Sequence, residues 1–168
     1  MIAMLAKLLK ALNSDSAPGQ IALAFALALI TGLTPLFSLH NVFVLFIACI
    51  VRLNFGAFLL GTLFFSGLAY LLDPAAIALG ESVLTHAAAQ GFLTDLYQSD
   101  FWRATRFNNT LVMGSFIISM IGFIPVLLLA RWLITVYRHK VMAWVEKLKI
   151  TKILKASKFY KVYQALAE

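Results

Sequence analysis

Three long stretches without a charged side chain constrain this chain more than any other feature of its sequence. They run over residues 20–51, 53–72 and 108–130. An α-helix rises about 1.5 Å per residue, so each stretch is long enough to cross the roughly 30 Å hydrocarbon core of a bilayer. Uninterrupted apolar sequence of this length is typical of helices that lie in lipid. We therefore predict an integral membrane protein built from helices.

The composition agrees with that prediction. Hydrophobic residues make up 62% of the 168 residues and charged residues only 12%, whereas a soluble domain is nearer half apolar and a quarter charged. We predict an all-α integral membrane protein with about four membrane-embedded helical segments and additional amphipathic surface helices. An N-terminal amphipathic helix over 1–16 precedes a membrane domain over 17–135, and a basic amphipathic cytoplasmic tail over 136–168 follows it.

The placement of charge predicts how the chain is threaded. The net charge is +7, and nine of the Lys and Arg residues lie between Arg131 and the C-terminus. The segment 73–109 instead carries four acidic residues and two arginines. Positive charge favours the cytoplasmic side, which places both termini and Arg52 inside and segment 73–109 outside. An even number of crossings is required, most simply four.

Turn-forming residues divide the membrane domain into helices. The sequence predicts helices over 17–33, 41–51, 55–72 and 111–134. Ser16 is expected to cap the first helix, with Pro18 in its first turn. The third helix is expected to stop at Asp73-Pro74.

The stretch TGLTPLFSLHN, residues 31–41, interrupts the first charge-free stretch with polar residues. Proline disfavours helix in the residue before it, so Thr34 should end one helix. The side chains of Ser38 and Asn41 can then satisfy freed backbone groups at the start of the next helix. The break lies either outside two full spans or near the midplane at the tip of a re-entrant hairpin. The candidate polar site at the break consists of Gly32, Thr34, Pro35, Ser38, His40 and Asn41.

Close helix packing is predicted from small residues four positions apart. The pairs are Ala22/Ala26, Ala24/Ala28, Ala57/Gly61, Thr62/Ser66 and Ser115/Ser119. At the inner face, Arg52 and Asn54 should form the turn between the second and third helices. Arg52 suits that place because a long basic side chain can reach the headgroup level.

Two amphipathic regions flank the last span. The outer segment 73–109 carries aromatic residues that prefer the headgroup level, and the candidate partner-docking residues there are Tyr97, Phe101, Trp102 and Phe107. In the tail, a lysine recurs at every third position, at Lys149, Lys152, Lys155, Lys158 and Lys161. These lysines are expected to contact anionic phospholipid headgroups. Because the basic segment directly follows a span, no nucleic-acid partner is expected.

The sequence gives no pattern for a reaction. It contains no paired nucleophile and base and no HExxH, P-loop, GxSxG or GxGxxG motif. The single cysteine, Cys49, lies in an apolar run, so neither a disulfide framework nor a cysteine-based metal site is expected. We therefore expect a protein that is not an enzyme and uses neither a metal nor another cofactor.

The order of motifs over residues 14–74 resembles a small bacterial inner-membrane family, domain of unknown function 2062. In that family a serine-proline start, a glycine-x-x-proline turn, an R-x-N break and a final aspartate- or asparagine-proline follow one another. Here they fall on Ser16/Pro18, Gly32–Pro35, Arg52/Asn54 and Asp73-Pro74. Where the family commonly has glycine and glutamine after the turn proline, this chain has Ser38 and His40.

The resemblance implies a multi-pass protein of the bacterial inner membrane. The chain looks like a long-tailed branch of the family, which implies a larger AsmA-like envelope protein as neighbour and partner. Our first hypothesis is a non-enzymatic accessory subunit that docks such a partner, with a role in phospholipid transport between membranes. The alternative is a small transporter or channel with a polar site at the 34–41 helix break, because broken helices mark substrate sites in transporters.

Overall fold

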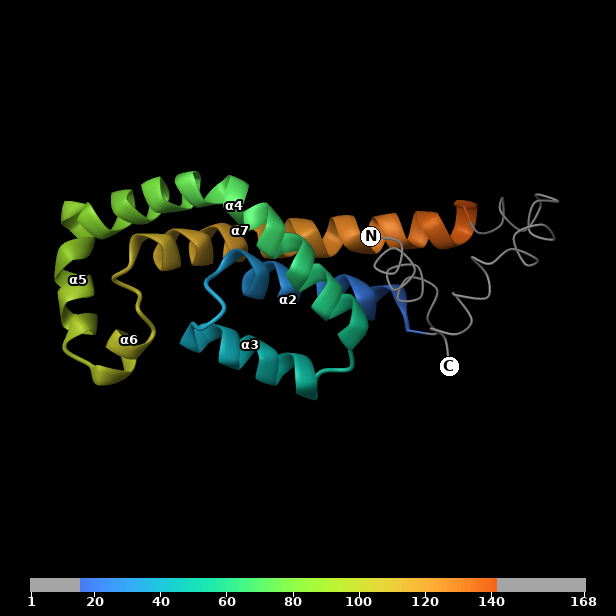
Figure 1. Ribbon diagram of the computed structural model, residues 1–168, viewed down its shortest axis with the longest axis horizontal. Helices are drawn as coiled ribbons and strands as arrows, with labels where there is room; N and C mark the ends of the chain where they lie inside the picture. The colour runs from blue at the N-terminus through green and yellow to red at the C-terminus, as the bar shows by residue number, and fades with distance from the viewer. Residues whose placement is uncertain (1–15, 142–168) are drawn as a thin grey trace.

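The computed structural model describes residues 16–141, which form helices joined by short turns and contain no strand. The helices are α2 (Pro18–Leu33), α3 (Leu39–Ile50), α4 (Phe55–Thr85), α5 (Ala87–Tyr97), α6 (Asp100–Ala104) and α7 (Thr110–Val136), followed by a π-helical turn, η1 (Tyr137–Val141) (Figure 1). The predicted N-terminal helix over 1–16 and nearly all of the predicted tail lie outside the described residues. The four predicted membrane helices correspond to α2, α3, α4 and α7.

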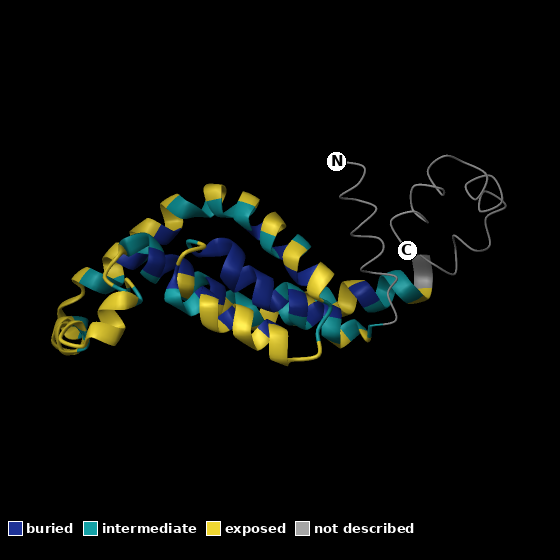
Figure 2. Ribbon diagram, turned by 60° about the horizontal axis from the view of Figure 1, so that its bottom comes forward, coloured by how far each residue is buried: buried dark blue, intermediate teal, exposed yellow. Residues whose placement is uncertain are grey.

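The centre of the molecule is α2. Most of its side chains are buried, and the helices packed against it are mainly α4 and α7 (Figure 2). Its alanines explain the close approach, because Ala22, Ala24, Ala26 and Ala28 are all fully buried. Small side chains let neighbouring helix backbones come close together. The predicted alanine pairs therefore do lie in the packed core.

Two helices in the described part of the chain are long and apolar enough to cross a membrane, by length and composition only. These are α4 and the continuous helix Thr110–His139 that contains α7. The other two apolar helices are shorter: α2 has 16 residues and α3 has 12, or roughly 24 and 18 Å at the α-helical rise. The length of α3 is therefore well below the thickness of a hydrocarbon core.

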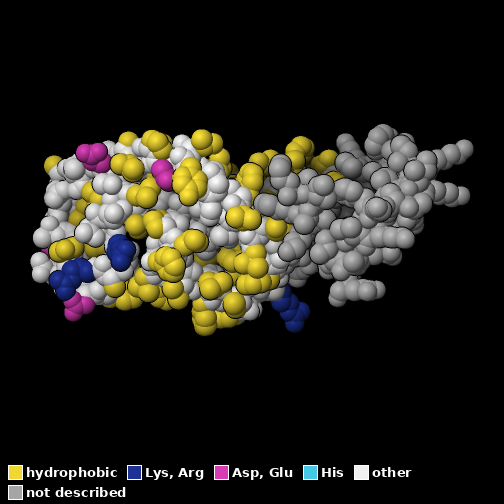
Figure 3. Space-filling model, in the orientation of Figure 1, with side chains coloured by type: hydrophobic (Ala, Val, Ile, Leu, Met, Phe, Trp, Pro, Cys, Tyr) yellow, Lys and Arg dark blue, Asp and Glu magenta, His cyan; other side chains and the backbone are white. Residues whose placement is uncertain are grey.

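The outer surfaces of these helices are apolar. Large hydrophobic side chains of α3, α4 and α7 are exposed, including Phe46, Leu63 and Leu128. In Figure 3, hydrophobic side chains cover the middle of the visible face. Charged side chains gather at the end that holds α5 and α6, and basic ones also lie where α3 meets α4. Exposed apolar surface of this extent marks contact with lipid or with another protein.

Helix α4 does not stop at Asp73-Pro74, as the sequence predicted, but continues through Pro74 to Thr85. It bends along its length (Figure 1), as a helix with an internal proline does. The residues beyond the proline are held in a helix by packing, because Ala76 and Gly80 are buried against α7. Tertiary packing therefore overrides the local stop signal, and the first third of the predicted outer segment 73–109 belongs to α4.

The tightest helix crossing lies between α4 and α7 and involves two glycines. A Cβ atom added to Gly114 would lie 1.8 Å from the carbonyl oxygen of Ala76, and one added to Gly80 would lie 1.9 Å from that of Thr110. The two backbones are thus in direct contact. The predicted pairs of small residues did not include this crossing. A second close approach joins Gly61 on α4 to Ala28 on α2, where an added Cβ would lie 2.8 Å from the alanine Cβ.

Candidate functional site at the helix break

The break between α2 and α3 is a turn that begins at Thr34. Helix α2 ends at Leu33, and Thr34 adopts an extended conformation with ψ of 156°, which confirms the predicted effect of Pro35. The Thr34 N–H still donates to the Ile30 carbonyl at 3.2 Å, and its hydroxyl lies 2.7 Å from the same oxygen. Thr34 therefore closes the last turn of α2 with both its backbone and its side chain.

Asn41 joins the two sides of the turn. Its Oδ1 accepts a hydrogen bond from the Thr34 hydroxyl at 3.0 Å, and its Nδ2 donates to the Pro35 carbonyl at 3.0 Å. The Ser38 hydroxyl donates to that same carbonyl at 2.6 Å. Thr34, Ser38 and Asn41 are all buried. Ser38 and Asn41 thus satisfy freed backbone groups, but at the turn carbonyls rather than at the N–H groups that begin α3.

A hollow of about 270 Å³ lies beside the turn, on the side of α4. Most of its lining surface is apolar, and we call it the polar hollow because hydroxyl groups and a carboxylate also line it. The turn contributes Gly32, Thr34 and Pro35, and α4 contributes Ser66, Tyr70 and Asp73. No Lys or Arg lines the hollow. The C-terminal end of a helix such as α2 carries partial negative charge, and Pro35 has no N–H to pair with the Thr31 carbonyl. Hydroxyl, carbonyl and carboxylate oxygens of this kind suit a cation or a proton.

Sequence reasoning missed Asp73 as a member of this site because it lies far from residues 31–41 along the chain. The signal that could have found it is the family resemblance. Both Gly32–Pro35 and Asp73-Pro74 belong to the motif set, and folding brings Gly32, Thr34, Pro35 and Asp73 around one hollow.

His40 does not line the polar hollow. Its ring instead lies 5.2 Å from the ring of Phe116 on α7. There it lines a second, apolar hollow of about 230 Å³. Its Nε2 atom is buried and has no hydrogen-bond partner among the described residues. The predicted polar site is therefore divided: Gly32, Thr34 and Pro35 border the polar hollow, Ser38 and Asn41 brace the turn, and His40 lies apart.

The opposite end of α2 joins the turn between α3 and α4. Asn54 Oδ1 accepts from the Ala57 N–H at 2.8 Å and so caps α4. Asn54 Nδ2 donates to the Ser16 hydroxyl at 3.2 Å. Ser16 was predicted to cap α2, but the cap position is Ala17, whose N–H donates to Gln20 Oε1 at 3.1 Å. Arg52 in this turn is exposed, as expected for an interfacial anchor.

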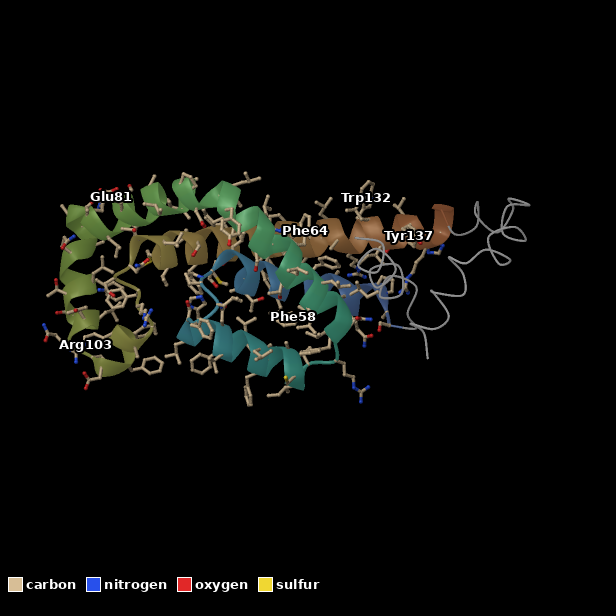
Figure 4. All side chains as sticks on the ribbon, in the orientation of Figure 1. Phe58, Phe64, Glu81, Arg103, Trp132 and Tyr137 are labelled. Atoms are coloured by element: carbon tan, nitrogen blue, oxygen red, sulfur yellow. The ribbon has the colours of Figure 1, made fainter. Side chains whose placement is uncertain are left out.

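The candidate docking residues lie at the far end of the molecule, in a region we call the outer lobe, which comprises α5, α6 and residues 105–109. Neither α5 nor α6 has a buried residue. Tyr97 contacts Phe107 edge-to-face, and Phe101 contacts Trp102 in the same manner. Figure 4 shows Arg103 in this lobe, and its guanidinium lies over the Tyr97 ring. Of the four residues, Phe107 is half-buried and the other three are exposed.

The remaining predicted site residues are Lys149, Lys152, Lys155, Lys158 and Lys161, which lie outside the described residues. Among the residues that the structure describes, no group of three or more His, Cys, Asp or Glu side chains could hold a metal ion. Cys49 is exposed on the surface of α3.

Comparison with known proteins gives a family and a relative. The profile of the family described as "Uncharacterized protein conserved in bacteria (DUF2062)" matches residues 3–143. A protein of Treponema pallidum, itself called uncharacterized, is 33% identical over 139 residues, which cover 82% of this chain and 85% of the relative. No solved structure matches.

Proposed function

We propose, from the premise that this chain belongs to the DUF2062 family of uncharacterized bacterial proteins, that it is a non-enzymatic accessory subunit of the bacterial inner membrane. In this proposal the outer lobe docks a larger, AsmA-like envelope protein, and the pair takes part in phospholipid transport between membranes. The partner and the transport role come from the family resemblance. The docking surface comes from the exposed side chains of the lobe.

The proposed threading uses two spans and one re-entrant hairpin. Helix α4 crosses outward and α7 crosses back, whereas α2 and α3 enter and return on the side of Arg52. The short length of α3 supports the hairpin, because 12 residues reach only about 18 Å. The Ser16–Asn54 hydrogen bond keeps the starts of α2 and α4 on the same side, as both this threading and one with four full spans require. Both termini are then cytoplasmic, and the outer lobe lies outside.

The observation that carries the docking proposal is the exposed aromatic surface of the outer lobe. Phe92, Tyr97 and Phe101 are all exposed. Charged residues such as Asp95 lie beside them on α5 and α6. Aromatic residues and arginine are enriched at protein interfaces. The charged neighbours make the lobe poorly suited to deep insertion in lipid. A partner protein would cover the aromatic side chains and leave the charges at the rim.

The test is affinity purification of the tagged chain from bacterial membranes in gentle detergent, followed by identification of retained proteins and lipids. The wild type is expected to retain a large envelope protein. The double variant Tyr97→Ala/Phe101→Ala should lower its recovery by tenfold or more, because truncation of an interface anchor costs about 2 kcal/mol or more. The matched control, Phe46→Ala/Phe43→Ala on exposed α3, should leave recovery unchanged. A chain that retains no partner in several detergents would count against the proposal.

A second candidate function, a small cation- or proton-linked transporter, is favoured by Asp73 at the helix break. An ionisable residue beside a broken membrane helix marks ion pathways, and Asp73 borders the hollow that contains the end of α2. Asp73→Asn should abolish any proton or sodium flux into liposomes that hold the purified chain, whereas exposed Asp95→Asn should not change it. Absence of flux in the wild type, at normal protein incorporation, eliminates this candidate.

A further inference from the structure

The apolar hollow beside His40 lies between the outer lobe on one side and helices α3 and α7 on the other. Helices α5 and α6 and the following loop supply Phe92, Leu93, Leu96, Trp102, Thr105 and Phe107, α7 supplies Val112, Met113 and Phe116, and α3 supplies His40. Almost all of this lining is aromatic or aliphatic. The hollow lies beyond the helix break and away from the polar hollow that contains Asp73.

In the described part of the chain, one buried side-chain nitrogen or oxygen makes no hydrogen bond. This atom is Nε2 of His40. The other polar side chain that could serve a ligand, Thr105, already donates its hydroxyl to the Trp102 carbonyl at 2.6 Å. A buried polar atom without a partner costs about 1–3 kcal/mol. Because His40 lines the hollow, its unpaired nitrogen indicates that a partner arrives there from outside the chain.

Water is a poor candidate for that partner. The hollow of about 230 Å³ equals the liquid volume of roughly eight waters, but an ordered water needs two to four polar neighbours. Among the lining side chains, His40 is the one with an unpaired polar atom. The complementary ligand is therefore an apolar chain that ends in one hydrogen-bonding group. Several lining residues, such as Phe92 and Trp102, are themselves exposed, so the hollow is open to the surroundings.

We propose that the hollow between His40 and the outer lobe is a binding site for one acyl chain of a lipid, whose oxygen-bearing end hydrogen-bonds to His40 Nε2. The site rests on the membrane placement given under the proposed function, because the bilayer supplies such ligands at this level. It does not depend on the envelope partner. Both a phospholipid and a free fatty acid share this chemistry, and they differ in the size of the polar end.

The test uses Trp102 as a reporter, because it lines the hollow. The full chain has three tryptophans, and Trp132→Phe with Trp144→Phe leaves Trp102 alone. Titration of the detergent-purified protein with a phospholipid brominated on one acyl chain should quench its fluorescence along a saturable curve. The unbrominated lipid should reverse the quenching by competition. A brominated fatty acid, titrated in parallel, identifies which of the two sources binds more tightly.

Variants at the hollow separate a specific site from lipid collision. His40→Phe keeps the ring contact with Phe116 and removes the nitrogen, and it should weaken binding by about two- to tenfold, the value of one hydrogen bond. Leu96→Trp should fill the hollow and abolish saturable quenching. Because the added tryptophan also fluoresces, the saturable part is identified by competition with the unbrominated lipid. His139→Ala, at an exposed histidine that does not line the hollow, should leave binding unchanged.

Two results would overturn the site. The first is quenching that rises linearly with both brominated lipids, and the second is saturable quenching that neither His40→Phe nor Leu96→Trp alters. A chain that binds the lipid but captures no envelope protein would overturn the docking proposal and support this one. A chain that captures the envelope protein but gives linear quenching would support the docking proposal and overturn the lipid site.

Discussion

Replacement of Gly114 by alanine is expected to destabilise the helix bundle more than any other single methyl addition. The added Cβ would lie 1.8 Å from the Ala76 carbonyl oxygen and 2.9 Å from the Gly80 nitrogen, and both are backbone atoms that cannot rotate away. The two helices must therefore separate. Overpacking of a well-packed contact costs about 1–3 kcal/mol, and a clash with backbone should reach the upper end of that range. Unfolding by a denaturing detergent, followed by circular dichroism, measures the change.

Two other glycines in the same helices or beside them provide controls. An added Cβ at Gly67 on α4 or at Gly91 on α5 meets nothing within 4 Å. Alanine has a higher helix propensity than glycine by about 1 kcal/mol, so both variants should be neutral or slightly more stable. The pair Gly80→Ala/Gly114→Ala should cost less than the sum of its single changes, because one separation relieves both clashes. Equal stability of Gly114→Ala and Gly67→Ala would show that the helices do not touch there.

The sequence predicted the positions of the four apolar helices well, apart from the end of α4. The ends of α2 and of α3, the Arg52–Asn54 turn and the extent of α7 follow from charge-free length, proline and asparagine, which act through the local backbone. These signals are strong because each one forbids helix or caps it within a few residues. Local chemistry therefore accounts for most of the element boundaries.

The features that the sequence did not reveal depend on contacts between distant segments. Pro74 reads locally as a helix end, but the contact of Gly80 with α7 continues the helix. Asp73 reads as the edge of an outer loop, but the bend of α4 places it beside the end of α2. His40 shares a short motif with Asn41, yet the two adjacent side chains serve different surroundings. The end of α4, the position of Asp73 and the surroundings of His40 all depend on contacts between helices, which no single segment of the sequence encodes.

Replacement of Asn41 by leucine is expected to detach α3 from α2. The change keeps the side-chain size but removes the bonds to the Thr34 hydroxyl and the Pro35 carbonyl. The loss of hydrogen bonds to buried groups costs about 1–3 kcal/mol. Besides Asn41, only Val44 and Ala48 of α3 are buried, so few other contacts can hold the helix. Amide hydrogen exchange should accelerate by about tenfold or more across α3 and stay slow in α2.

A double-mutant cycle with Thr34→Val assigns that loss to the turn itself. Because the two side chains bond each other at 3.0 Å, the two changes together should cost less than their sum by about 0.5–3 kcal/mol. Asn108→Leu, at an exposed asparagine in the outer lobe, should leave exchange in α3 unchanged. If the costs of Asn41→Leu and Thr34→Val simply add, and α3 stays protected, apolar packing rather than the polar turn fixes the hairpin. The buried polar residues of the break would then be free to serve a ligand instead of the fold.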